Sequence, residues 1–125
     1  MAFSSDRQMR SGSGWRIGWD PSRHPYCALL GSDHWAIELT AEEFQDVSRL
    51  AFQLADTMQH MQQELMDEER ISCEAESDRV WVEVEGYPQS YELRFIVLGD
   101  RGVEGQWPAE VVPYLLKALQ MISIF

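Results

Sequence analysis

The sequence predicts a single α+β domain in which two antiparallel β-meanders each end in a helix. Three observations lead to this prediction. The length of 125 residues suffices for one core, apolar and polar residues alternate in two separate blocks, and apolar residues at helical spacing follow each block. Because this order of elements occurs twice, we expect two halves, residues 15–69 and 70–125, related by an internal pseudo-twofold symmetry.

Residues 1–14 are expected to form a flexible N-terminal tail. They are rich in Ser, Gly and Arg and contain no apolar stretch of the kind found in secretory signals. Order is expected to begin at Trp15, because large apolar residues alternate with small or charged ones as far as Trp19. Turn-forming residues then separate two further predicted strands, over residues 26–30 and 35–39.

A long helix is predicted to begin after Thr40. Thr40 and Glu43 match a capping box, and Leu39 and Phe44 flank it as a hydrophobic staple. The apolar residues that recur at spacings of three and four are Phe44, Val47, Ala51, Leu54, Met58, Met61 and Leu65. This seam predicts a helix of about 25 residues, roughly 38 Å long, which covers a sheet or pairs with another helix.

The second half repeats this order of elements. Alternating residues predict strands over 71–76 and 80–85, joined by a hairpin turn at 77–79. A largely apolar strand suited to the middle of a sheet is predicted over residues 91–98, and a short fourth strand over 103–106.

A closing helix is predicted with Pro108 in its first turn and Glu110 near its positive end. Its buried face is expected to consist of Val111, Val112, Leu115, Leu116, Leu119 and Ile122. Pro113 must lie in the first turn or mark the start of this helix, because proline breaks a helix interior.

No motif in the sequence predicts catalysis, a cofactor or a bound metal. There is no phosphate-binding loop and no nucleophile elbow, and no second ligand pair completes the His24–Cys27 spacing. Cys27 and Cys73 lie far apart in apolar stretches, so we expect two buried thiols in a reducing compartment. No apolar run approaches the length of a membrane span. We therefore expect a non-enzymatic cytoplasmic protein.

Acidic residues outnumber basic ones by 21 to 10, which gives a net charge of −11. This charge disfavours nucleic acid and anionic membranes as partners. The predicted hairpin places Glu74, Glu76, Glu83 and Glu85 on one outer sheet face, together with Trp81. Three interpretations stay open: a solvated face that maintains solubility, a docking face for a basic partner, and a weak divalent-cation site.

A second candidate surface comprises Trp15, Arg16, Trp19 and Arg23. Tryptophans beside arginines can stack on single-stranded nucleic acid, although core tryptophans with solvent-directed arginines give the same pattern. We expect the partner to be another protein, with nucleic acid as the alternative. The helical seam permits either a monomer or a homodimer.

A resemblance to a known family rests on five stretches of the chain: GWRIGWDPSRHPY, DHWAIELTAEEF, ELMDEERISCEAES, WVEVEGYP and EGQWPAE. These stretches resemble a cyanobacterial family known as a domain of unknown function, and the likeness runs from about Gly14 to the C-terminus. The resemblance implies a fold similar to the Whirly and single-stranded-DNA-binding-regulator class, in which a β-sheet-plus-helix unit is present twice. Through that fold it implies single-stranded nucleic-acid binding as the alternative function.

Overall fold

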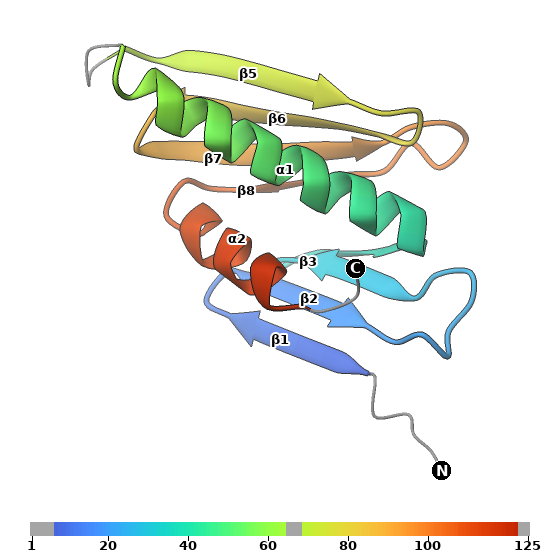
Figure 1. Cartoon of the computed structure of the whole chain (residues 1–125). Helices are drawn as coiled ribbons and strands as arrows, with labels where there is room; N and C mark the ends of the chain where they lie inside the picture. Colours follow the sequence, from blue (N-terminus) through green and yellow to red (C-terminus); the bar gives the residue numbers. More distant parts are fainter. Residues whose placement is uncertain (1–6, 65–68, 123–125) are drawn as a thin grey trace.

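The computed structural model describes residues 7–64 and 69–122, which form two four-stranded antiparallel sheets and two helices (Figure 1). The first sheet, in the order β1-β2-β3-β4, comprises β1 (Gln8–Gly12), β2 (Trp15–Trp19), β3 (Ala28–Gly31) and β4 (Ala36–Leu39). The second sheet, in the order β5-β6-β7-β8, comprises β5 (Ile71–Glu76), β6 (Val80–Tyr87), β7 (Ser90–Val97) and β8 (Glu104–Trp107). Helix α1 (Ala41–Met61) follows the first sheet, and α2 (Val112–Met121) follows the second. The predicted α+β class is confirmed.

The prediction of a flexible tail over residues 1–14 is wrong for residues 8–12, which form β1. This strand pairs with β2 in antiparallel register, with Arg10 opposite Ile17. A tight turn joins the two strands, and Gly14 adopts a φ of +89° there, which favours glycine. The sequence of β1 is polar and shows no alternation of apolar and polar residues. Its extended conformation therefore results from pairing with β2 and not from its composition.

Helix α1 begins as predicted. The Thr40 hydroxyl accepts a hydrogen bond from the Glu43 N–H, and the Thr40 N–H donates to the Glu43 carboxylate. The buried members of the predicted seam are Phe44, Val47, Ala51, Leu54 and Met58. The helix has 21 residues instead of about 25 because Met61 is only half-buried, so packing does not support further turns. Leu65 lies outside the described residues.

Helix α2 begins at Val112, and the prediction that Pro108 lies in its first turn is wrong. Residues 108–111 form a separate turn, in which the Val111 N–H donates to the Pro108 carbonyl. Pro113 occupies the first turn of the helix, where its missing N–H costs no hydrogen bond.

Helix α1 packs mainly against the sheet of the other half of the chain. It lies on β5 and β6, whereas α2 contacts both β2 of the first sheet and β7 of the second (Figure 1). The edge strands β4 and β8 contact each other, and the buried residues of both halves form one continuous cluster. The two sheets and the two helices therefore share a single core.

Two side chains of the second half join it to the first half where β4 and β8 meet. The Trp107 indole N–H donates to the Gly31 carbonyl over 3.0 Å. Arg101, in the loop between β7 and β8, forms an ion pair with the Glu43 carboxylate and donates to the Glu38 carbonyl. These contacts fix the second sheet against the start of α1 and the end of the first sheet.

The two cysteines are both free thiols, but they differ in burial. Cys27 is buried, as expected, and burial raises the pKa of its thiol. The expectation is wrong for Cys73, which is half-buried because β5 is an edge strand of its sheet.

Candidate functional site

The candidate site is the face of the second sheet that points away from the helices. Along β6, the buried Val80, Val82 and Val84 alternate with residues that point outward. The antiparallel register places Glu74 opposite Glu83. The outward residues predicted from the sequence, all brought together on this face, are Glu74, Glu76, Trp81, Glu83 and Glu85.

The third and fourth strands add residues that the sequence analysis missed. Glu92 and Arg94 lie on β7 opposite Glu85 and Glu83, and Glu104 and Gln106 lie on β8. The signal for β7 was present, because Glu92 and Arg94 alternate with buried Leu93, Phe95 and Val97. We define the glutamate face as the nine residues Glu74, Glu76, Trp81, Glu83, Glu85, Glu92, Arg94, Glu104 and Gln106.

Arg94 is the basic residue at the centre of the glutamate face. Its guanidinium lies 3.4 Å from a Glu83 carboxylate oxygen and 3.9 Å from Glu104. It also lies over the Trp81 ring, 4.9 Å from the ring centre, in a cation–π contact. Arg94 therefore ties three neighbouring strands together and orders the Trp81 side chain.

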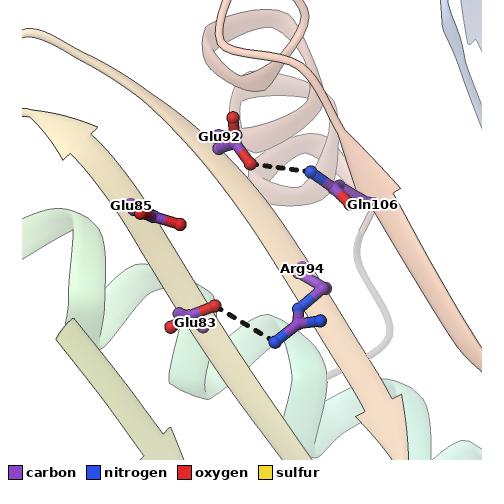
Figure 2. A pocket seen from close by; sticks show the side chains of 5 residues that line it. All are labelled: Glu83, Glu85, Glu92, Arg94 and Gln106. Atoms are coloured by element: carbon purple, nitrogen blue, oxygen red, sulfur yellow. Dashed lines mark hydrogen bonds and ion pairs between the residues drawn. The ribbon is translucent and has the colours of Figure 1, made fainter. Parts of the chain in front are cut away.

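A shallow pocket of about 210 Å³ opens beside Arg94. Figure 2 shows its five lining side chains, Glu83, Glu85, Glu92, Arg94 and Gln106, which come from β6, β7 and β8. The Gln106 amide donates to the Glu92 carboxylate over 2.7 Å (Figure 2). The Arg94 guanidinium donates to the Glu83 carboxylate over 3.4 Å. The lining is almost wholly polar, so the pocket presents hydrogen-bond acceptors rather than an apolar wall.

Two pairs of like charges face each other across the strands. Glu74 lies directly opposite Glu83, and Glu85 lies directly opposite Glu92. Opposed like charges destabilise a sheet. The Ser72 hydroxyl donates to Glu83, and Arg70 lies 3.6 Å from Glu85, so both pairs are partly compensated by neighbours at the β5 edge.

The residues Trp15 and Trp19 of the nucleic-acid alternative point toward the core. Both share the inner side of β2 with buried Ile17 and pack against the core cluster. The Trp19 ring stacks on Phe44 of α1, with 6.4 Å between the ring centres.

Arg16 and Arg23 are held by other groups. The Arg16 guanidinium, on the outer side of β2, donates to the backbone carbonyls of Ser32 and Trp35 over 2.8 and 3.0 Å. Arg23 lies in the loop before β3 and forms a 2.8 Å ion pair with Glu38. The structure therefore does not bring the two tryptophans and the two arginines together on one face.

Within residues 7–64 and 69–122, neither helix has the length and apolar character that a bilayer span requires. In the same part of the chain, no group of three or more His, Cys, Asp or Glu side chains is arranged to hold a metal ion.

Comparison with known proteins identifies the family. Residues 10–122 match the family described as "Domain of unknown function (DUF1818)". The chain belongs to the DUF1818 family. A crystal structure of a protein of unknown function from Prochlorococcus sp. NATL2A, described as a member of the DUF155 family, is 30% identical to this DUF1818 chain. The similarity covers 93% of this chain and 98% of that one, with a TM-score of 0.87. No curated protein matches. The expected kinship with a family of unknown function is confirmed, with a relative in a cyanobacterium.

Proposed function

We propose that this DUF1818 protein is a non-catalytic cytoplasmic binding module whose glutamate face docks a basic segment of another protein. The observation that carries the proposal is the pair of like-charge contacts, Glu74 with Glu83 and Glu85 with Glu92. Each contact lowers the stability of the sheet, and a bound cation would relieve both.

The half-buried centre of the glutamate face supports the same function. Glu83 and Arg94 expose only 19% and 39% of their side chains, so their geometry is set before a partner binds. Trp81 beside them supplies an aromatic surface, and aromatic residues are enriched where proteins meet. A basic segment lying across β6 and β7 would place its cations between the glutamates and its apolar groups against Trp81.

The test compares two triple variants with the same change in net charge. The face variant carries Glu74→Gln, Glu76→Gln and Glu85→Gln. The control variant carries Glu42→Gln, Asp56→Asn and Asp100→Asn, three exposed acids away from the glutamate face. The probe is a fluorescein-labelled peptide of eight alternating lysine and valine residues, titrated in about 150 mM salt to screen weak long-range attraction.

We expect the face variant to bind the peptide at least about tenfold more weakly than the natural chain, a loss of about 1.4 kcal/mol. The control variant should change the affinity less than about twofold. An equal loss in both variants would mean that only the overall charge attracts the peptide. That result, or no binding at about 1 mM protein, would contradict the proposal.

The alternative partner is single-stranded nucleic acid, bound through Trp15, Arg16, Trp19 and Arg23. It has less support, because the tryptophans pack inward and both arginines already have acceptors. A titration of labelled oligothymidine at low salt, where polyanion binding is strongest, tests it directly. Saturable binding that these four residues control would favour the alternative.

We also propose that the two halves are related by a pseudo-twofold axis in a Whirly-like arrangement. The support is the repeated order of four strands and a helix, together with the packing of α1 on the second sheet and the contact of α2 with β2 of the first. A helix that packs on the opposite sheet is what two identical units would achieve by swapping helices. Superposition of residues 8–61 on residues 71–121 tests this proposal, and a failure to align the four strands in order would overturn it.

A further inference from the structure

Most of the ten basic side chains of this acidic protein already have a partner. The arginines that pair with a carboxylate or a backbone carbonyl are Arg16, Arg23, Arg49, Arg70, Arg79, Arg94 and Arg101. In contrast, no described residue forms a hydrogen bond or an ion pair with Arg7, Arg10 or Lys117. Lys117 is the single lysine of the sequence.

Arg10 and Lys117 line the same surface hollow, although 107 positions separate them in the chain. The hollow has a volume of about 410 Å³ and lies between β1 and α2. Met9 and Arg10 come from β1, Trp15 from β2, and Tyr114, Lys117 and Met121 from α2. We call it the β1–α2 hollow.

The Arg10 side chain is partly withdrawn from solvent in this position. Its Nε atom is buried and has no hydrogen-bond partner among the described residues. Buried polar groups are normally hydrogen-bonded, and an anionic oxygen of a carboxylate or a phosphate is a strong acceptor for a guanidinium. The β1–α2 hollow therefore favours an anionic group beside Arg10, within reach of the Lys117 ammonium.

Apolar side chains of α2 flank these two cations. Tyr114 and Met121 are 64% and 52% exposed, and they are two of the five large hydrophobic residues that are exposed in the described part of the chain. Tyrosine and methionine are enriched at protein interfaces. The β1–α2 hollow thus combines apolar contact area with a pair of cations.

The free edge of β1 selects an extended peptide as the occupant. The sheet order places β1 at an end, and no described strand pairs with its outer edge. Every second residue of an edge strand directs its N–H and C=O away from its neighbour, which offers hydrogen bonds to an added strand. Small molecules favour enclosed apolar pockets, whereas the walls of this hollow are open to solvent.

Charge decides between a peptide and a nucleic acid, and it also orients the peptide. A strand of nucleic acid carries one phosphate per nucleotide and would meet the net charge of −11 along its whole length. A neighbouring hollow on the other side of Trp15 and Tyr114 contains Asp33 and Glu110. An acidic residue of the peptide is therefore directed to the Arg10 end and away from the Asp33 end.

We propose that the β1–α2 hollow docks an extended acidic segment of another protein. The segment adds a strand to the free edge of β1 and places a carboxylate between Arg10 and Lys117. This site is separate from the glutamate face, so either proposal can fail without affecting the other.

The experiment titrates the full chain with a fluorescein-labelled peptide of eight alternating valine and aspartate residues. A twin peptide carries asparagine in place of aspartate. The hollow variant combines Arg10→Gln with Lys117→Gln, and a matched control combines Arg23→Gln with Arg70→Gln, two exposed cations elsewhere. Met121→Glu is a third variant. It adds to the hollow a negative charge that repels the aspartates of the peptide, at an exposed position that the fold does not need.

We expect the aspartate peptide to bind with a dissociation constant below about 1 mM, and at least about tenfold more weakly to the hollow and Met121→Glu variants. The control variant should bind like the natural chain. Amide NMR shifts should change in residues 8–12 and 112–121. Lack of binding at about 1 mM, equal binding of the asparagine twin, or an equal loss in the control would overturn the proposal.

Two other occupants have their own signatures. Tighter binding of a twelve-nucleotide oligothymidine than of the aspartate peptide, lost in the hollow variant, would mean that the hollow holds nucleic acid. Sedimentation that shows self-association without peptide, abolished by Arg10→Gln, would mean that a second copy of the chain fills it. Either result would overturn the assignment to an acidic peptide.

Discussion

The Ser77 hydroxyl donates a 2.7 Å hydrogen bond to the Asp46 carboxylate, across 31 positions of the chain. Asp46 lies on α1, and Ser77 lies in the turn between β5 and β6. Ser77 Oγ also accepts from the N–H groups of Arg79 and Val80, and the Arg79 guanidinium lies 3.4 Å from Asp46. One buried carboxylate therefore anchors the hairpin of the glutamate face to the helix behind it.

Replacement of this carboxylate should destabilise the protein. Asp46→Ala removes the acceptor for Ser77 and Arg79, which should lower the free energy of unfolding by about 1–3 kcal/mol. Asp56→Asn on the exposed side of the same helix is the control and should change it by less than about 1 kcal/mol. Urea unfolding measures both values, and equal effects would rule out a special role for the Asp46 anchor.

The Asp46 anchor should also make stability depend on pH. Burial by itself would raise the pKa of Asp46, but hydrogen bonds from Ser77, Arg49 and Arg79 outweigh burial and lower the pKa below 3.8. The contribution is therefore complete above the unfolded pKa and is lost as the pH falls through the folded pKa. The stability difference between the natural chain and Asp46→Asn should be constant from about pH 6 to pH 5 and shrink below about pH 4. A difference that grows on acidification would contradict this sign.

Ser48 lies on the same helix as Asp46 but, unlike Asp46, has no hydrogen-bond partner for its side chain among the described residues. Its hydroxyl is buried. Ser48→Ala removes this unsatisfied group and improves helix propensity, so it should leave stability unchanged or raise it by up to about 1 kcal/mol. Thermal unfolding followed by circular dichroism checks this. A clear loss of stability would mean that the hydroxyl has a partner after all.

The two members of the Glu74–Glu83 pair should respond in opposite directions. Glu74→Gln removes a like charge opposite Glu83 and should raise stability by roughly 0.2–1 kcal/mol. Glu83→Gln weakens the contacts to Arg94 and Ser72 and should lower stability by up to about 1 kcal/mol. Urea midpoints at low and high salt measure both. A loss of stability in Glu74→Gln would show that the two charges do not repel each other measurably.

Gly105 should not tolerate a side chain. A methyl group at this position would lie 2.3 Å from the Trp35 ring and 2.8 Å from Phe95. Gly105→Ala should therefore cost about 1–3 kcal/mol, because these rings are packed tightly with Trp107. Trp35→Phe in the same chain should restore part of the loss by making room, and a double-mutant cycle measures the coupling. Purely additive effects would contradict the packing argument.

Local patterns were sufficient for much of the fold. The Thr40–Glu43 capping box fixes where α1 starts by bonds between neighbours, and the alternation in β5 and β6 shows which residues point outward. Five residues of the glutamate face followed from that alternation and from the turn at 77–79. The outward direction of Glu92 and Arg94 could have been predicted in the same way, but the many apolar residues of their strand concealed the alternation.

Local patterns were insufficient wherever a partner strand or helix supplied the stabilising contact. Residues 8–12 have no strand signal of their own and become β1 because they exchange backbone hydrogen bonds with β2. The sequence by itself determined the α+β class, the start of α1 and the acidic face, because these depend on neighbouring residues and on period. Only the tertiary structure decided that α1 packs on the second sheet, that Asp46 anchors a distant turn, and that Arg10 and Lys117 line the same hollow. Contacts between residues far apart in the chain depend on how whole elements pack, and no local spacing encodes that packing.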